Sequence, residues 1–276
     1  MRFHPGNIYL FSRNSYSFVW HLIFFGGTLT ELVSGNFFSI QPALAQLIPD
    51  DTLGVESTVV TSSIETDNVL VEQIEGGATR GSFLFHSFFD FNIAENQQVY
   101  FANPNGIDHI LTRITGLSSS NIFGTLGVSG EADLFLLNPN GVIFGPNVQL
   151  DIRGSFLVST ADSFNLGNAA EFSATDPQAP PLLIVDVPVG LQYGALTQGD
   201  ITNAGILQVG QNLVISADNI VSTGQLLAPH GELKVEGITG DVQVQAIAAD
   251  TATLFTAENL ILEESQLWTQ GDLSLL

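Results

Sequence analysis

Short apolar or alternating runs, each closed by Gly, Asn or Asp, set the strongest limit on how this chain can fold. Examples are "VYFANPNG", "NLVISADNIV" and "ELKVEGITGDVQVQAI", which are rich in β-branched and aromatic residues. In "VQLDIRG", Val148, Leu150 and Ile152 face one way and the residues between them face the other, which is the period of a β-strand. Because no stretch shows a capped helical pattern, the sequence predicts an all-β protein.

The second half repeats itself. "GQNLVIS" and "GELKVEG" place Leu213 and Leu233 20 residues apart, and "AENLILE" from Ala257 and "QGDLSLL" from Gln270 restate the theme with looser spacing. Recurrence of short strands at such an interval indicates a β-solenoid of stacked coils. Periodicity alone also permits an antiparallel sandwich, with turn residues every 8–12 positions.

One segment, residues 173–194, departs from the pattern because it holds Pro177, Pro180, Pro181 and Pro188. Proline gives no backbone donor to a sheet, so it belongs at edges or in excursions. We expect a loop or short edge strand that projects from the stack. Strands resume in the same style afterwards, so this segment does not mark a new domain.

The first 45 residues differ in character from the rest. Two arginines precede an aromatic-rich apolar run at 16–29, and "ALA" ends at residue 45, with small residues at the −3 and −1 positions. This layout predicts a signal peptide over residues 1–45, cleaved before Gln46. The alternative is a retained anchor, but the apolar run is shorter than the ~20 residues that span a bilayer.

The remaining chain, 46–276, is strongly acidic. It carries 27 acidic and four basic residues, for a formal net charge of −23; the basic residues are Arg80, Arg113, Arg153 and Lys234. Such a surface repels phosphate backbones, which excludes nucleic acid as a partner. The chain is also 45% hydrophobic and can bury a core, which argues against disorder. Without cysteine it has no disulfides, despite the predicted export.

The sequence gives little sign of an active site. A β-helical polysaccharide-active enzyme needs either a basic residue with acidic calcium ligands or a pair of carboxylates. The acidic pairs Asp50-Asp51 and Glu263-Glu264 are interpreted as terminal or solvated. Finding Asp151, Glu131 and Arg153 scattered would dismiss the enzyme alternative. His86, in "FLFHSFFDF", is interpreted as a packed residue. No zinc, calcium or phosphate-binding motif occurs, so we predict no catalytic residues, no metal and no cofactor.

The most distinctive motif in the sequence is a four-residue turn that occurs twice. Asn-Pro-Asn-Gly occurs in "YFANPNGID" and in "FLLNPNGVIFGPN", each time between apolar runs. Proline fixes φ at the second position of a type I turn, asparagine tolerates the third, and glycine accepts the left-handed conformation that follows. The candidate site residues are Asn103, Pro104, Asn105, Gly106, Asn138, Pro139, Asn140 and Gly141.

These turns, the block "LFHSF" and the run "GSFLVSTAD" occur together, in the order in which one known family has them. The chain resembles the N-terminal secretion domain of filamentous haemagglutinin-like proteins, the haemagglutination-activity domain of two-partner secretion, in its cyanobacterial form. The resemblance is strong over residues 52–170 and looser through "PVGLQYG" and "LLAPHGELKVEG". In the family, one of the two turns commonly ends in Leu rather than Gly-Ile, whereas here both read Asn-Pro-Asn-Gly.

The resemblance implies a right-handed parallel β-helix with a few extra-helical strands or loops over residues 46–276. It implies an export address, recognised by the periplasmic domains of a partner outer-membrane β-barrel transporter, on an adhesin-like protein destined for the cell surface or the medium. A ligand on a host or neighbouring cell would be a further partner. The first alternative to this function is the β-helical polysaccharide-active enzyme, and the second is a passive surface structural protein. The resemblance does not say whether the transporter reads the two turns or whether they only serve folding, nor whether the chain is part of a longer protein.

Overall fold

The computed structural model describes residues 46–64, 70–167, 170–182, 190–194 and 199–276. These residues form strands β1 to β24 and one short 3-10 turn, η1 (Gly54–Glu56), as the sequence predicts. Within this part of the chain no helix is long and apolar enough to cross a membrane. The predicted signal peptide at 1–45 lies outside the described residues and stays a prediction.

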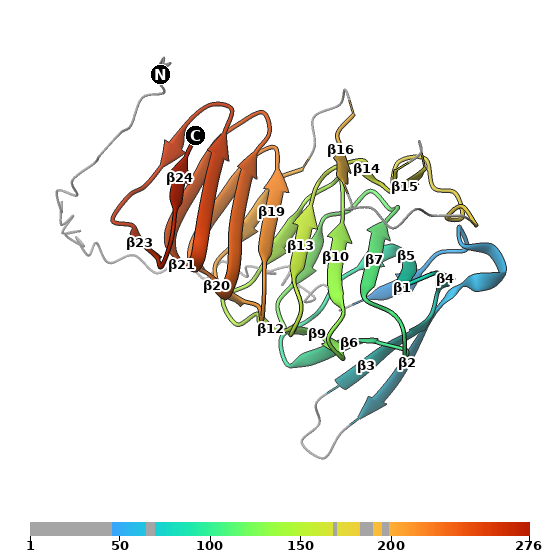
Figure 1. Cartoon of the computed structure of the whole chain (residues 1–276). Coiled ribbons are helices and arrows are strands. Elements are labelled where there is room, and N and C mark those ends of the chain that lie inside the picture. The colour runs from blue at the N-terminus through green and yellow to red at the C-terminus, as the bar shows by residue number, and fades with distance from the viewer. Residues whose placement is uncertain (1–45, 65–69, 168–169, 183–189, 195–198) are drawn as a thin grey trace, which may run out of the picture.

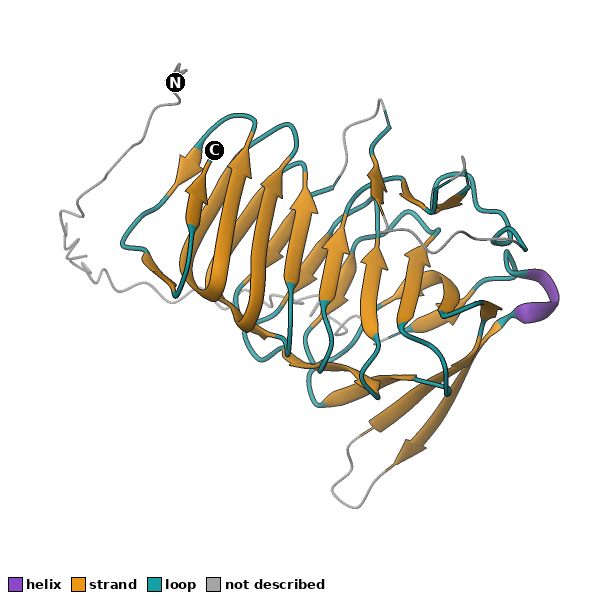
Figure 2. Ribbon diagram, in the orientation of Figure 1, coloured by secondary structure: helices purple, strands orange, loops and turns teal. Residues whose placement is uncertain are grey.

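The chain winds into a right-handed parallel β-helix whose coils have three faces (Figures 1 and 2). The first face runs across the middle of Figure 1 as a row of parallel strands. Its separate strands are β5 (Phe83–Phe91), β7 (His109–Ile114), β10 (Asp133–Leu137), β13 (Phe156–Ser159), β19 (Leu213–Ala217) and β24 (Leu273–Leu275). Strands β20 (Ile220–Gly237) and β21 (Val242–Thr256) turn through all three faces and give their last residues to this one.

The other two faces are built from shorter strands. The second face holds β8 (Ser120–Ile122), β11 (Val142–Phe144), β17 (Ile201–Asn203) and β22 (Leu260–Ile261). The third face holds β6 (Gln97–Ala102), β9 (Thr125–Ser129), β12 (Gln149–Asp151), β18 (Ile206–Gln208) and β23 (Gln266–Thr269). Each coil therefore visits the first, second and third face in turn.

Coil-to-coil pairing decides between the two architectures that the sequence permits. Leu213 of β19 lies in register with Leu233 of β20, as their spacing predicts, and the pairing is parallel. The sandwich alternative is therefore wrong. The proposed repeat at "AENLILE" is also wrong in its position, because Leu260 pairs with Val242 on the second face. "QGDLSLL" does return to the first face, where Leu273 pairs with Ala252.

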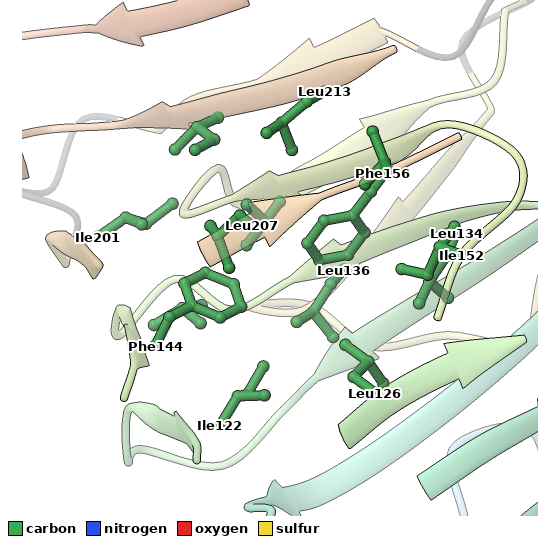
Figure 3. Close-up of a cluster of buried hydrophobic side chains, with 14 of the residues drawn as sticks. Ile122, Leu126, Leu134, Leu136, Phe144, Ile152, Phe156, Ile201, Leu207 and Leu213 are labelled. Carbon is green, nitrogen blue, oxygen red and sulfur yellow. The ribbon is translucent and has the colours of Figure 1, made fainter. Parts of the chain in front are cut away.

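The core lies inside the coils. Side chains from the three faces converge there, among them Leu136, Phe144 and Leu207, each at most 1% exposed (Figure 3). The predicted alternation of "VQLDIRG" is confirmed: Val148 and Ile152 are buried, Leu150 is partly buried and the intervening residues are exposed. Stacking identical inward positions coil upon coil gives one continuous apolar interior.

The N-terminal end of the stack is closed by antiparallel strands. β1 (Leu47–Pro49) and β4 (Ala78–Arg80) both pair with β5. The hairpin of β2 (Thr58–Ile64) and β3 (Leu70–Gly76) projects away from the coils, and β3 then joins the third face through β6 (Figure 1). These strands cover an edge that would otherwise offer unpaired backbone groups.

A second, smaller core lies outside the coils, beneath an excursion between β13 and β17. The excursion holds a three-stranded antiparallel sheet of β14 (Ser163–Asn165), β15 (Glu171–Ser173) and β16 (Gly190–Gln192). Phe164 and Phe172 of this sheet pack with the outward residues Phe83 and Phe85 of β5. The proline-rich stretch predicted at 173–194 falls inside this longer segment, and part of it lies outside the described residues.

We expect Phe156→Ala to lower the free energy of unfolding by about 3–5 kcal/mol, because the ring is fully buried between coils and its loss leaves a cavity. Phe89→Ala is the matched control. Its ring is 51% exposed on the same face, so the loss should stay under about 1 kcal/mol. Denaturant unfolding measures both; equal losses would contradict the placement of the core.

Candidate functional site

The two Asn-Pro-Asn-Gly turns occupy different corners of the coil. The first joins β6 to β7, where the chain passes from the third face of one coil to the first face of the next. The second joins β10 to β11, where the chain passes from the first to the second face. The sequence predicts two equivalent turns, but the structure gives them different neighbours.

At the first corner, the described structure gives only the leading asparagine side-chain hydrogen bonds; the carbonyl of Pro104 accepts from the N–H of Ile107 at 3.1 Å. The Nδ2 of Asn103 donates to the carbonyl of Ile107 at 2.8 Å. Its Oδ1 accepts from the backbone N–H groups of Glu131 (3.1 Å) and Ala132 (3.2 Å), which belong to the same corner one coil further on. Asn103 thus joins two successive coils.

The tip of the first turn faces solvent. Pro104, Asn105 and Gly106 are all exposed. Gly106 has a φ of +83°, and nothing lies within 4 Å of the position that a Cβ would take. In the described part of the chain, the Asn105 side chain has no hydrogen-bond partner. The first corner therefore presents a bare Pro-Asn-Gly tip.

The second turn is packed into its corner. Asn138 is fully buried, and its Nδ2 donates to the carbonyl of Ser118 and to Oγ of Ser120, both at 3.0 Å. Its Oδ1 accepts from the backbone N–H of Asn140 at 3.0 Å, which closes an Asx turn. The Nδ2 of Asn140 then reaches the carbonyl of Gly116, in the preceding coil, at 2.9 Å.

The following coil holds this second turn from the other side. The carbonyl of Pro139 accepts from the N–H of Gly199 at 2.7 Å. Gly141 is buried with a φ of +107°, and a Cβ there would lie 2.7 Å from the carbonyl oxygen of Asp200. Glycine is required for both the conformation and the space. All four residues of this turn are therefore fixed between two neighbouring coils.

A buried arginine, which the sequence did not single out, links the N-terminal strands to the excursion. The guanidinium of Arg113 is fully buried and donates to Oγ of Ser87 (3.0 Å), Oγ1 of Thr52 (2.7 Å) and the carbonyl of Gln178 (2.9 Å). It also lies 4.1 Å from the ring centre of Phe172. One side chain thus connects parts of the chain that are far apart in sequence.

The sequence suggests a solvated Asp50, but that prediction is wrong: the residue is partly buried and completes this network. Burial raises the pKa of Asp50, but hydrogen bonds from Thr115, Thr52 and Ser87 outweigh that effect and leave the pKa below its usual value. Burial lowers the pKa of Arg113 to about 10, although attraction to Asp50 opposes the shift. Both groups are therefore charged at neutral pH, and the buried cation has its counter-charge nearby.

Arg80 acts beside Arg113 in the same way. It forms a bidentate ion pair with Glu56, at 2.9 and 2.7 Å, and donates to the carbonyls of Pro181 (3.1 Å) and Pro180 (3.3 Å). The sequence marks these prolines as an excursion, but it does not reveal that two of the four basic residues of 46–276 hold the backbone of that excursion.

His86 is a packed residue, as predicted. It is fully buried beside Phe101, and its Nδ1 lies 3.3 Å from Oγ1 of Thr58. Burial lowers its pKa to about 3, so the ring is neutral at physiological pH. In the described ranges no group of three or more His, Asp or Glu side chains is arranged to hold a metal ion.

The residues named for the enzyme alternative are only partly scattered. Glu131 lies at the corner of the first turn, where its backbone bonds to Asn103. Asp151 and Arg153 line one groove on the third face, together with His230. Asp151 is the sole carboxylate among the described residues that line this groove, so it does not supply the carboxylate pair of a glycoside hydrolase.

Comparison with known proteins bears on the whole β-helix. The model of the TPS secretion domain family matches residues 45–272, which include both turns. The heme/hemopexin-binding protein of Haemophilus influenzae (strain Rd) is 25% identical over 142 residues. That stretch is 49% of this chain but only 14% of the relative's length, so the chain corresponds to a small part of that protein.

Two solved structures are also similar. The crystal structure of the filamentous hemagglutinin secretion domain gives a TM-score of 0.46 at 16% identity, covering 83% of this chain and 99% of that one. The HMW1 secretion domain from Haemophilus influenzae gives a TM-score of 0.41 at 16% identity, covering 74% and 71% of the two chains.

We expect Arg113→Met to lower the free energy of unfolding by about 2–4 kcal/mol, because the change leaves buried hydrogen-bonding groups and the carboxylate of Asp50 without their cation. Lys234→Met is the control. Lys234 forms a partly exposed ion pair with Glu236 at 2.7 Å, worth at most about 1 kcal/mol. If the two variants lost equal stability in denaturant unfolding at pH 7, Arg113 would not hold the excursion.

His86 should make the protein sensitive to acid. The unfolded chain binds a proton at this ring below about pH 6.5, whereas the folded chain does so only near pH 3. Stability is therefore lost as the pH falls between those values. His86→Phe should reduce the slope of unfolding free energy against pH by about 1.4 kcal/mol per unit between pH 4 and 6. Chemical denaturation at several pH values measures the slope, and an unchanged slope would show that His86 titrates normally.

Proposed function

This chain belongs to the TPS secretion domain family, and from that premise we propose that residues 46–276 are an export address read by an outer-membrane β-barrel transporter. Family membership makes it the secretion domain of a two-partner secretion substrate, an exported protein of the kind that a partner transporter recognises. The family is not one of enzymes. The single observation that carries the proposal is the match over residues 45–272, which include the whole coil stack described above from Gln46 on, apart from its last four residues.

The proposed export route crosses the inner membrane and then the outer membrane. Residues 1–45 direct the chain across the inner membrane and are removed before Gln46, and the transporter's periplasmic domains then bind the acidic chain. The net charge of −23 for residues 46–276 supports passage, because self-repulsion opposes collapse and aggregation before folding. The absence of cysteine also removes the risk of disulfides forming in the periplasm. The destination is the cell surface or the medium, where an adhesin-like protein contacts a host or neighbouring cell.

Within the address we assign different tasks to the two turns. The turn at Asn103–Gly106 is the one that the transporter reads, since its Pro-Asn-Gly tip makes no side-chain contribution to the coil. The turn at Asn138–Gly141 serves folding, since its side chains bond to the preceding coil and its backbone to the following one. Asn103 serves both tasks: it is the first residue of the turn that the transporter reads, and its side chain also bonds to the backbone of the next coil.

Asn105 and Asn140 hold the same position in the two turns and provide a matched test. Asn105→Ala should leave the free energy of unfolding within about 0.5 kcal/mol of the parent chain, because its side chain is exposed and unbonded. It should nevertheless reduce secretion of the full chain severalfold when the partner transporter is co-expressed. Asn140→Ala should lower stability by about 1–2 kcal/mol through loss of its bond to Gly116.

Immunoblots of medium and cell fractions measure secretion, and denaturant unfolding of the purified chains measures stability. Cells without the transporter are the control for both variants. Normal secretion of Asn105→Ala would show that the first turn is not read. Secretion of the parent chain without the transporter would overturn the export assignment itself.

A further inference from the structure

A recess on the third face arises from unequal coil lengths. Phe144 pairs with Asn203, and Phe156 pairs with Leu213, yet the chain between the two phenylalanines is two residues longer than the chain between their partners. Because the ends are held in register, the longer segment must bow outward over the shorter one. Strands β12 and β18 consequently face each other across a gap, and β18 pairs only with β20.

The next coil is also longer than the coil of β18. Gln208 pairs with Leu227 and Leu213 with Leu233, which leaves one additional residue in β20 where Pro229 and His230 project. The coil of β18 is therefore recessed between two longer neighbours. The result is a groove of about 710 Å³, with Ile206 and Gln208 lining it between the two longer coils. This volume lies within the range of small-ligand sites.

The groove holds a cation that the protein itself does not use. Of the four basic residues of 46–276, Arg80, Arg113 and Lys234 each have partners, as described above. Arg153 is exposed in the groove, and in the described part of the chain its guanidinium has neither an ion pair nor a hydrogen bond. On a chain this acidic, an arginine without an ion pair inside a groove is a strong local exception.

The remaining lining is suited to hydroxyl groups and to one negative charge. Asn147, Gln149 and Gln208 offer amide donors and acceptors, and His230 adds a ring nitrogen. Asp151, the one carboxylate of the described lining, accepts a hydrogen bond from the Tyr100 hydroxyl at 3.1 Å, on the side of the preceding coil. The charged side chains of the lining, Arg153 and Asp151, balance each other, so the groove is locally neutral within an acidic surface.

We propose that this groove binds an acidic saccharide, with a uronate carboxylate on Arg153 and the sugar hydroxyls on the amides. A guanidinium matches a carboxylate by two parallel hydrogen bonds, and such charge-assisted bonds are stronger than neutral ones. Ile206 and Pro229 supply apolar surface for the C–H face of the ring. The site does not depend on the export route, because it is formed only by the folded coils.

Trigalacturonate is the probe, and its methyl ester is the matched ligand, because the ester keeps the hydroxyls and removes the charge. Titration calorimetry with the full chain should detect trigalacturonate and show binding at least tenfold weaker for the ester. Equal affinity for both, or displacement of trigalacturonate by sulfate at equal ionic strength, would overturn the assignment.

Protein variants provide the second arm. Arg153→Gln should weaken trigalacturonate binding at least tenfold without moving the thermal midpoint, because the side chain has no partner to lose. Lys234→Gln removes the same charge from the first face and should bind normally. Ile206→Trp, which fills the groove, should also abolish binding. Retained binding in Arg153→Gln or in Ile206→Trp would place the ligand elsewhere.

Discussion

The in-register return of the chain is the constraint on which this structure depends. Leu134, Phe156, Leu213 and Leu233 form one column, each paired with the next across successive coils of the first face. Because both edges of every inner strand of this face bond to neighbouring coils, a shift by one residue would turn a whole coil's apolar side chains outward. What lies between the columns is much less restricted. Phe156 and Leu213 are direct neighbours although the excursion separates them in sequence, whereas Leu213 and Leu233 are 20 residues apart. A long insertion costs little as long as its ends close on the same corner.

The coils therefore differ from one another mainly at the corners between the faces. The same four residues form a solvent-exposed tip at Asn103–Gly106 and a buried junction at Asn138–Gly141, because the second lies between the backbones of residues 116 and 199–200 and the first does not. The excursion is held by a related device. Its proline-rich backbone cannot join a ladder, so its carbonyls are satisfied by the guanidinium groups of Arg80 and Arg113. These cations are structural, and their burial is compensated by Glu56 and Asp50.

The sequence pattern predicted the features that depend on neighbouring residues, and it missed those that depend on residues far apart in the chain. The alternation in "VQLDIRG" predicted strands and their inward faces. The interval between Leu213 and Leu233 indicated a solenoid, because equivalent inward positions recur once per coil, but it did not exclude a sandwich. The family resemblance rests on the two turns and the phenylalanine block. Prediction was wrong at Leu260 because strands on different faces look alike in sequence and only their partners separate them.

The role of Arg113 was missed because it depends on Gln178, 65 residues away. The bond is made by the carbonyl of Gln178, so the identity of that side chain gives no signal. Similarly, β5 is rich in phenylalanine because the coil interior covers one of its sides and the excursion the other.

The net charge of the chain does not predict the charge inside the groove, which depends on how the coils stack. A value of −23 for residues 46–276 describes a surface that repels polyanions, and this is why the sequence predicts no nucleic-acid partner. At physiological ionic strength, however, charges are screened beyond about 8 Å, so a recess is governed by its own lining. In the groove between β12 and β18 that lining contains one unpaired guanidinium, while the only carboxylate described there is bonded to Tyr100. The recess exists because the coil of β18 is shorter than both of its neighbours, a comparison that cannot be made until residues on either side of the excursion are known to stack. An acidic protein can therefore hold an acidic ligand, provided that its topology brings together a spare cation and a gap in the sheet.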